Sequence, residues 1–291
     1  MREKYDIVMI GHVSKDIMIY EGEEERLLGG AVVYSSAAAA RSGASVLVVT
    51  KAAAEDRHQL TVIEESGAEL LVQDTPKTTS IKNEYHTPDR EKRTVTLRAR
   101  ADSFTLDDIP DVQARIFDLA GLFAGELPVS LIQPLSQRGE VAIDAQGVLR
   151  TAVGESLEFR GWEEKEKYLP HVTYLKTDAA EAEILTGESD REQACRLLLE
   201  AGAHEVMVTH NSEVIVGSAG KIYRAPLTPR NLSGRTGRGD TCFAAYLTYR
   251  MKHGIQDSVE YAAALVSMKM ESPGVFRGTP EEVEKRIRGA V

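Results

Sequence analysis

The segment with the clearest chemical potential is the glycine-rich run Thr236-Gly-Arg-Gly-Asp-Thr241. Its glycines let successive backbone N–H groups point the same way, and the apolar run that follows predicts that a helix begins here. A helix N-terminus favours phosphate because its amides are unpaired and its dipole end is positive. Arg238 could add a charge-assisted contact. Asp240 would then lie beside the anion and could accept the proton of an attacking hydroxyl during phosphoryl transfer.

The same run also has a purely structural interpretation. Aspartate is a common N-cap residue, so the local pattern alone favours Asp240 as a cap on a tight loop–helix turn. The run is not a P-loop, because no Gly-Lys-Ser/Thr follows the glycines. The local pattern therefore leaves both hypotheses open, and the decision depends on the rest of the chain.

Two features near the N-terminus could bind a substrate. Gly29-Gly30 precedes a predicted helix over Ala31–Ser42 and could let a polyol approach the backbone, although this pattern alone favours a simple loop before a helix. Asp16 follows the first predicted strand, Ile7–Ile10, on the side where ligands collect in open α/β sheets. Its carboxylate could accept hydrogen bonds from substrate hydroxyls, or it could be an ordinary solvated side chain.

Asp178 and Glu181 lie three residues apart at the start of a predicted helix, directly after the strand Tyr174–Leu175. This spacing places both carboxylates on one helix face. Two such groups could orient Mg²⁺ through water, since Mg²⁺ keeps several waters and uses few protein ligands. The alternative is that they complement the helix dipole in its first turn.

These candidates must be positioned by a chain in which short apolar runs alternate with helical patterns, which predicts a doubly wound α/β fold. The expected strands are Ile7–Ile10, Val46–Val49, Val141–Ile143, Tyr174–Leu175 and Val206–Val208. The expected helices are Ala31–Ser42, 56–65, Ala179–Leu185, Arg191–Ala201, Thr241–Lys252 and Ser258–Met270. Two predicted hairpins, within 79–100 and within 214–223, interrupt this alternation, and the first is expected to form an added lobe.

Composition limits the class of partner. The chain has 291 residues and a net charge of −10, which argues against nucleic-acid and anionic-membrane partners because these are bound by basic surfaces. Only two cysteines occur, without metal-ligand spacing, which is typical of a reducing compartment. No apolar stretch approaches 18 residues. We therefore predict a cytoplasmic protein with no membrane partner.

The order of these features is itself informative. Gly29-Gly30, then Asp178-x-x-Glu181, then Thr236-Gly-Arg-Gly-Asp240 resemble the PfkB (ribokinase-like) carbohydrate kinase family over nearly the whole chain. Three further stretches are similar to the myo-inositol-kinase-like branch of that family: Ile10–Asp16, Leu28–Ser35 and Ala142–Arg150.

The resemblance implies one ribokinase-like domain over 1–291, a three-layer sandwich with a mostly parallel central sheet. Residues 78–100 would be an inserted β-lid over the substrate. It implies ATP and Mg²⁺ as cofactors. It also implies a role for each matching position: Asp240 as catalytic base; Gly237, Arg238 and Gly239 as the anion hole; Asp16, Gly29, Gly30 and Tyr34 as substrate-binding residues; Thr209 and Thr236 as nucleotide-binding residues; Asp178 and Glu181 as the pair linked to Mg²⁺.

Four departures from the family pattern limit what is implied. Gly234 replaces an aspartate that many members carry, so a monovalent-cation site is in doubt. Tyr34 stands where many sugar kinases have an asparagine, which weakens assignment as a plain ribokinase or fructokinase. Arg238 replaces a small residue, and the segment after Thr209 lacks the usual glycine, so nucleotide preference is open.

We therefore predict an ATP-dependent kinase acting on a hydroxyl of a small-molecule sugar or cyclitol. A nucleoside kinase on the same fold and a non-catalytic polyol or nucleotide sensor are the alternatives. A dinucleotide-dependent oxidoreductase is disfavoured, because Gly11 is followed by His-Val-Ser and not by the glycine-rich pyrophosphate fingerprint. Two copies are expected to pair through the lid, since exposed sheet surfaces tend to be covered.

Overall fold

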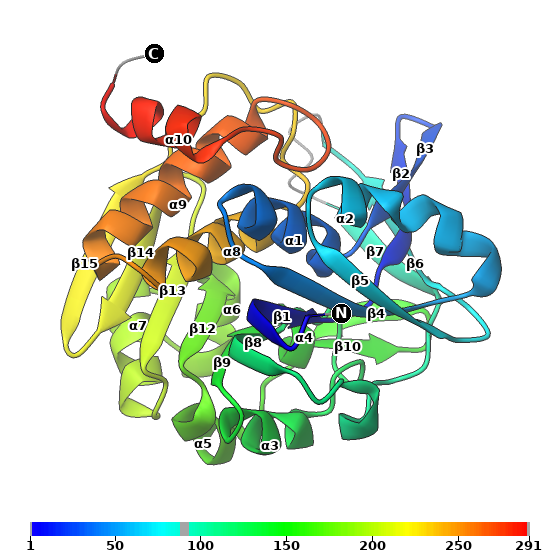
Figure 1. The fold of residues 1–291 in the computed structure, drawn as a ribbon, viewed down its shortest axis with the longest axis horizontal. Coiled ribbons are helices and arrows are strands. Elements are labelled where there is room, and N and C mark those ends of the chain that lie inside the picture. Colours follow the sequence, from blue (N-terminus) through cyan, green and yellow to red (C-terminus); the bar gives the residue numbers. More distant parts are fainter. Residues whose placement is uncertain (1, 88–92, 290–291) are drawn as a thin grey trace.

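The computed structural model describes residues 2–87 and 93–289. Its core is a nine-stranded sheet in the order β15-β14-β13-β12-β9-β8-β1-β4-β5 (Figure 1). The pairs from β5 to β13 are parallel, and β14 and β15 add an antiparallel hairpin at one edge. The bounds are β1 Lys4–Ile10, β4 Val46–Ala52, β5 Glu69–Asp74, β8 Gln113–Leu119, β9 Glu140–Asp144, β12 Tyr174–Asp178, β13 Glu205–Thr209, β14 Glu213–Ser218 and β15 Lys221–Pro226.

Helices cover both faces of this sheet (Figure 1). One layer contains α1 (Ala31–Arg41), α2 (Thr61–Glu65), α8 (Arg238–Arg250), α9 (Ile255–Met270) and α10 (Pro280–Ile287). The other contains α3 (Ile132–Ser136), α5 (Lys165–Tyr168), α6 (Ala179–Thr186) and α7 (Arg191–Glu200), and α4 (Gln146–Leu149) follows β9. Each layer closes its own apolar core against the sheet. The predicted three-layer α/β architecture with a mostly parallel central sheet is confirmed.

Small residues explain why α1 lies so deep in the first layer. Its sequence, Ala-Val-Val-Tyr-Ser-Ser-Ala-Ala-Ala-Ala-Arg, is buried from Ala31 to Ala39. The short side chains let α8 pack against α1 while α9 packs against α8. The N-termini of α1 and α8 are thereby held together at the edge of the sheet where β1 ends.

A second, six-stranded sheet has the order β10-β11-β7-β6-β2-β3. The hairpin predicted within 78–100 supplies only β6 (Thr79–Tyr85) and β7 (Arg93–Ala99), and its turn at 88–92 lies outside the described residues. The sequence analysis missed the other four strands: β2 (Ser14–Tyr20), β3 (Glu23–Gly29), β10 (Arg150–Val153) and β11 (Ser156–Phe159). Pairing of two copies through this sheet stays a prediction.

The missed hairpin β2–β3 has an apolar run, Ile17–Tyr20, in its first strand only. Its turn is made by Glu21 and Gly22, which both have positive φ (50° and 85°), the backbone that a tight hairpin turn requires. The strand after it begins Glu-Glu-Glu-Arg, so no alternation of apolar and polar residues marks it. Asp16, expected only to follow the first strand, is therefore part of a second strand, β2.

One smaller expectation changed, and two further elements were not predicted. The helix expected over 56–65 is a 3₁₀ segment, Ala54–Leu60, followed by α2. Strand β8 was missed because Arg115 and Asp118 interrupt its apolar run, and α10 was missed as well.

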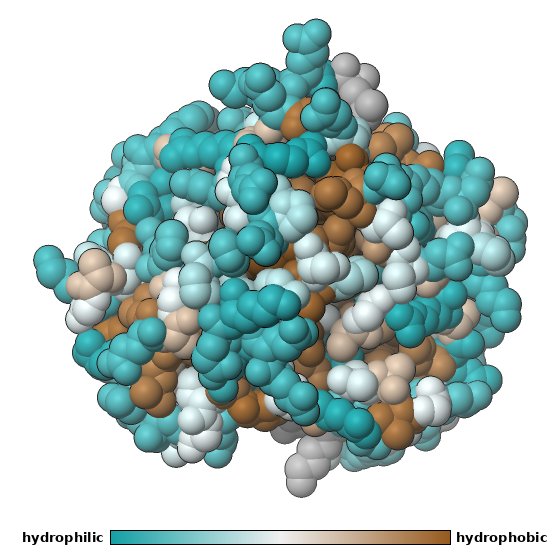
Figure 2. All heavy atoms as spheres, turned by 90° about the horizontal axis from the view of Figure 1, so that it is seen from below, coloured by the Kyte–Doolittle hydropathy of each residue, from teal (hydrophilic) through white to brown (hydrophobic). Residues whose placement is uncertain are grey.

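Among helices of the described chain, none has the length and apolar character needed to span a membrane. Viewed from below, hydrophilic side chains cover most of the surface, with hydrophobic ones in scattered groups (Figure 2).

Candidate active site

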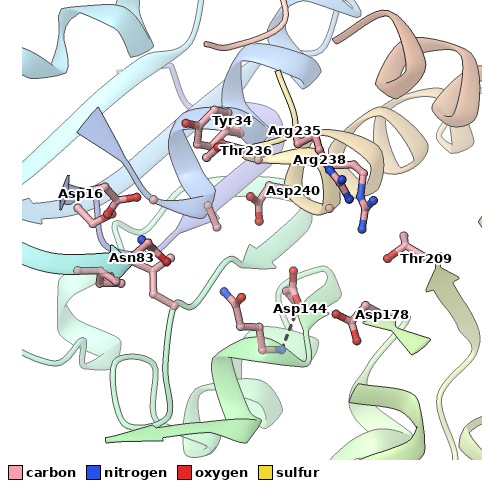
Figure 3. A pocket seen from close by; sticks show the side chains of 18 of the residues that line it. Asp16, Tyr34, Asn83, Asp144, Asp178, Thr209, Arg235, Thr236, Arg238 and Asp240 are labelled. Atoms are coloured by element: carbon pink, nitrogen blue, oxygen red, sulfur yellow. Dashed lines mark hydrogen bonds between the residues drawn. The ribbon is translucent and has the colours of Figure 1, made fainter. Parts of the chain in front are cut away.

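A cavity of about 730 Å³ lies between the N-terminal turn of α8, the ends of the central strands and one face of the second sheet. Asp240 lies in its middle, with Asp16 and Asn83 at one end and Asp178 and Thr209 at the other (Figure 3). Of the residues predicted to form the site, Gly29 does not line the cavity. The others do: Asp16, Gly30, Tyr34, Asp178, Glu181, Thr209, Thr236, Gly237, Arg238, Gly239 and Asp240.

Asp240 is in the first turn of α8 but does not cap it. The N-cap is Gly237, which has a left-handed backbone (φ 75°) and whose carbonyl accepts a hydrogen bond from Thr241 N–H at 3.0 Å. The structural interpretation of Asp240 as a helix cap is therefore wrong. Burial, and then the nearby Asp144, raises the pKa of Asp240 to about 6, while Lys176 and Lys269 oppose that rise. Such a carboxyl group is ionised at neutral pH yet basic enough to accept a proton.

The glycines beside Asp240 make room for two neighbours. A Cβ on Gly237 would lie 2.2 Å from the ring of Tyr34, and one on Gly239 would lie 3.1 Å from Nζ of Lys176. Within the described part of the chain, the N–H of Gly237 has no hydrogen-bond partner. The turn therefore presents an unpaired backbone donor to the cavity, at the positive end of a helix dipole.

Lys176 is the principal residue at this site that the sequence analysis missed. Its Nζ is bonded to both carboxylate oxygens of Asp144, at 2.8 and 3.1 Å, and lies 3.8 Å from Glu181. Although burial lowers the pKa of Lys176, the charges of Asp144 and Glu181 more than compensate and raise it above its usual range. A lysine in the middle of the buried strand Tyr174–Asp178 was the available signal, because lysine is rarely buried without a partner.

Two further buried acids in this region have raised pKa values. Burial raises the pKa of Asp118 to about 8, and the charges of Asp144 and Asp240 act in the same direction. Burial also raises the pKa of Glu181 to about 8, against the effect of Lys176. The ammonium of Lys176 thus bonds directly to Asp144 and also lowers the pKa of Asp240.

At the second-sheet end, Asp16 projects into the cavity from β2. Its Oδ1 accepts a hydrogen bond from the hydroxyl of Ser14 at 2.7 Å, and burial raises its pKa to about 6. A Cβ on Gly29 would lie 2.3 Å from the Asp16 carboxylate. Gly29 therefore makes room for a substrate-facing side chain, although it does not line the cavity itself.

Two buried polar side chains at this end were also missed. Asn83 and Arg150 are 5% and 6% exposed and line the cavity. Within the described residues, neither side chain has a hydrogen-bond or ion-pair partner. Burial lowers the pKa of Arg150 to about 10. Buried polar groups are normally paired, so both point to a polar ligand between the second sheet and Asp240.

The opposite end of the cavity is lined by Asp178, Thr209 and Arg238 (Figure 3). Nη1 of Arg238 donates to Oδ1 of Asn211 at 2.7 Å, which connects α8 to the segment after β13. Thr209 ends β13, and its hydroxyl donates to the carbonyl of Thr177 at 3.3 Å. These groups offer positive charge and hydrogen bonds next to the turn at Gly237.

Asp178 and Glu181 form a capping box at the start of α6, a more specific structural role than the dipole complementation expected as the alternative. Glu181 N–H donates to Oδ1 of Asp178, and Asp178 N–H donates to Oε2 of Glu181, both at 2.8 Å. One oxygen of each carboxylate remains outside the box, and both residues line the cavity. With Lys176 only 3.8 Å from Glu181, this pair fits Mg²⁺ held through water better than by direct coordination.

A family model described as pfkB family carbohydrate kinase matches residues 3–282. The chain belongs to the PfkB family. The protein is therefore a phosphotransferase whose acceptor is an alcohol group. No curated protein matches the chain.

Solved structures agree with the family. A pyrophosphate-dependent kinase in the ribokinase family, complexed with a pyrophosphate analog and myo-inositol, is 37% identical, with a TM-score of 0.89 over 96% of this chain and 99% of that one. A pyrophosphate-dependent myo-inositol-1 kinase, converted into a myo-inositol-3 kinase by two substitutions, is 36% identical, with a TM-score of 0.89 over 98% and 99%. Arabidopsis thaliana ribokinase, complexed with ribose and ATP, is 19% identical over 98% and 99%, with a TM-score of 0.73, and shows the shared fold.

Proposed function

We propose that this PfkB kinase transfers a phosphoryl group from inorganic pyrophosphate to a hydroxyl of a cyclitol of the myo-inositol class. The observation that carries the proposal is the position of Asp240. Within the described residues, its carboxylate lies between the cavity end that holds the unpartnered side chains of Asn83 and Arg150 and the unpaired amide at the start of α8. A hydroxyl held at that end would face both its base and the phosphoryl group.

The acceptor is argued from the second-sheet end of the cavity. Asp16 supplies hydrogen-bond acceptors, Arg150 supplies donors, and Asn83 supplies both. A small ring bearing several hydroxyls satisfies all of these groups at once. The two kinases at 36% and 37% identity are described with myo-inositol, which supports a cyclitol acceptor for this chain.

The donor is argued from the opposite end. Arg235 and Arg238 line it (Figure 3). Among the described residues, three large aliphatic ones line the cavity, and of these Ile81 belongs to the second sheet, Leu122 follows β8 and Leu232 lies in the loop before α8. Leu232 is 51% exposed, so it offers little enclosed apolar surface of the kind that usually holds a nucleobase. Two guanidinium groups beside the amide of Gly237 suit a compact polyanion. The relatives described as pyrophosphate-dependent support the same donor.

ATP, the donor predicted from the sequence, is the competing candidate. The turn at Gly237 would bind the terminal phosphoryl group of either donor, and Thr209 lines the cavity where a nucleotide would extend. The choice between the two donors therefore depends on how the cavity binds the part of the donor that follows its terminal phosphoryl group.

The chain's own residues perform four steps in this proposal. The second-sheet end orients the acceptor, Asp240 accepts its proton, and the amide of Gly237 with Lys176 stabilises charge on the phosphoryl oxygens. The second sheet excludes water, the competing acceptor. Asp178 and Glu181 would hold Mg²⁺ through water, which supplies charge neutralisation at the donor.

A matrix of donors and acceptors tests the proposal. Pyrophosphate, ATP and triphosphate are each combined with myo-inositol, pentoses, hexoses, inosine, adenosine and cytidine, and phosphorylated products are identified by ³¹P NMR. We expect a cyclitol monophosphate from pyrophosphate. A product formed with ATP but not with pyrophosphate would show that ATP is the donor. A nucleoside monophosphate would indicate that the protein is a nucleoside kinase. Thermal stabilisation by a polyol without any product would indicate the non-catalytic sensor.

A further inference from the structure

Lys269, near the C-terminal end of α9, is a buried cation close to the anion-binding turn. Its side chain is among the largest that are fully buried, with 2% of the residue exposed. Its Nζ donates to the carbonyl of Gly234 at 2.6 Å and to the carbonyl of Thr236, and lies 5.2 Å from the centre of the Tyr34 ring. Across the described residues no carboxylate forms an ion pair with it. A buried ammonium without such a partner is costly, so its retention calls for a reason.

The loop that Lys269 holds is packed directly on the end of α9. Gly234 N–H donates to the carbonyl of Met270 at 2.8 Å, and the hydroxyl of Ser233 donates to the carbonyl of Glu271 at 2.8 Å. A Cβ on Gly234 would lie 1.8 Å from the carbonyl oxygen of Ser272. No side chain fits at position 234, so no carboxylate there can provide the charge near these carbonyls. The ammonium of Lys269 instead provides a positive charge at the carbonyls of Gly234 and Thr236.

The bond to Thr236 affects the anion-binding turn through a single peptide group. Every peptide bond of the described chain is trans, so the C=O of Thr236 and the N–H of Gly237 point in opposite directions. The ammonium of Lys269 takes the C=O, and the N–H on the other side of the same peptide is the unpaired donor. Lys269 therefore fixes the direction of that donor, and its charge polarises the peptide so that the N–H becomes a stronger donor.

We propose that Lys269 is a positioning residue, whose ammonium acts as an internal monovalent cation that orients and polarises the Gly237 amide toward the transferred phosphoryl group. Two converging carbonyl oxygens are the ligands that a bound alkali cation or ammonium ion would otherwise use. The protein accordingly needs no added monovalent cation. This inference rests on the proposed phosphoryl transfer at the Gly237 turn.

The first test compares cation dependence in the wild-type protein and in Lys269→Ala. With tetramethylammonium as the only monovalent cation, wild-type turnover should stay within about twofold of its value in K⁺, Na⁺ or NH₄⁺. Lys269→Ala should lower kcat by about 10 to 100-fold, less than the loss of a whole oxyanion donor, and leave the acceptor KM unchanged. Ammonium or methylammonium should restore at least a third of the lost turnover by occupying the vacated space.

Lys51→Ala is the matched control. Lys51 is also buried, and its Nζ donates to the carbonyl of Ser103 at 3.0 Å and to Asp108 at 2.9 Å, away from the cavity. It should lower stability without any ammonium-dependent recovery of turnover. Three results would overturn the proposal: activation of the wild type more than fivefold by K⁺, unchanged kcat in folded Lys269→Ala, or a loss that no cation restores.

Pyrophosphate binding measured by calorimetry separates this inference from the proposed function. If the wild type transfers no phosphoryl group to any acceptor, the proposed function fails, but weaker pyrophosphate binding by Lys269→Ala, recovered with methylammonium, still supports the role of Lys269. Equal binding by both proteins contradicts it. If Lys269→Ala does not fold, Lys269→Met keeps the volume and gives the same comparison, with ammonium expected to leave its deficit unchanged.

Discussion

The ammonium of Lys176 lies 2.8 Å from the carboxylate of Asp144, and both side chains are less than a tenth exposed. The pair joins β12 to β9 directly beneath Gly239. Because the ammonium of Lys176 lies beside the first turn of α8, Lys176→Met should lower kcat by about 10² to 10³, measured as initial rates at saturating donor and acceptor.

A second variant separates this role from stability. Lys176→Met leaves Asp144 buried and unpaired, which typically costs about 3–5 kcal/mol. Lys176→Met/Asp144→Asn removes that unpaired charge and should recover most of the melting temperature. Turnover should stay low in the double variant, and its return to normal would show that Lys176 is only structural.

Asp240→Asn should lower activity but raise stability, whereas Lys176→Met should lower both. Loss of the base should lower kcat by about 10² to 10⁴. The melting temperature at pH 7.5 should rise by a few degrees, because the neutral amide avoids the burial cost of an ionised carboxylate. Near-normal turnover in a correctly folded variant would contradict the assignment of Asp240 as base.

The pH dependence of this stability difference follows from the sign of the shift. Burial raises the pKa of Asp240 from 3.8 to about 6, so the folded state holds its proton more tightly than the unfolded chain does. The wild type therefore becomes progressively less stable relative to Asp240→Asn as pH rises from about 4 to 6, and the difference is constant above that. Thermal melts at pH 4.5, 5.5 and 7.5 measure it.

Turnover should have a bell-shaped pH profile. Asp240 must be ionised to accept a proton, so kcat/KM should fall as pH drops through about 6, and Asp16, with a similar pKa, steepens that limb. Burial lowers the pKa of Lys269 to about 8, so a second fall is expected above that pH. The alkaline fall should disappear in Lys269→Met, and its persistence there would assign it to another group.

Gly237→Ala should abolish activity, and Gly220→Ala provides its control. Both glycines have left-handed backbone, with φ of 75° and 78°. A Cβ on Gly237 would lie 2.2 Å from the ring of Tyr34, whereas one on Gly220 would meet nothing within 4 Å. Both variants should lose about 1 kcal/mol from backbone strain, but only Gly237→Ala should lose turnover as well. Comparable turnover in the two variants would remove the Gly237 turn from the mechanism.

The sequence predicts the parallel sheet, its helices and the cluster around Asp240 because each depends on local periodicity and on glycine spacing. It fails where pairing is non-local. Asp16 lies within a sheet strand because β2 pairs with β6, some 65 residues away, and charged residues hide this strand pairing. Lys176 and Lys269 are recognisable only once packing shows which carboxylate or carbonyls each one faces. Arg150 ends the stretch Ala142–Arg150 that carries part of the family resemblance, but only the structure shows that its side chain is buried and lines the cavity.

The two unpartnered side chains at the second-sheet end give the last prediction. Arg150→Met and Asn83→Leu should each raise the acceptor KM by about 10 to 100-fold, since a lost hydrogen bond to a polar ligand typically costs about 1–3 kcal/mol. The pyrophosphate KM should not change, because Asn83 lies across Asp240 from the donor end (Figure 3) and Arg150 begins β10 of the second sheet. Asn83→Leu should also alter which hydroxyl is phosphorylated, since an apolar wall at this position turns the ring relative to Asp240.

Arg98→Met on β7 is the matched control for Arg150→Met. Arg98 is exposed, lies on the same sheet and pairs with Glu155, and it lines a groove away from Asp240. Because exposed ion pairs contribute little, its replacement should leave both KM values and the product unchanged. ³¹P NMR identifies the phosphorylated position. If Arg150→Met behaves like Arg98→Met, with an unaltered acceptor KM, the buried guanidinium does not contact the acceptor and the second-sheet end is not the acceptor site.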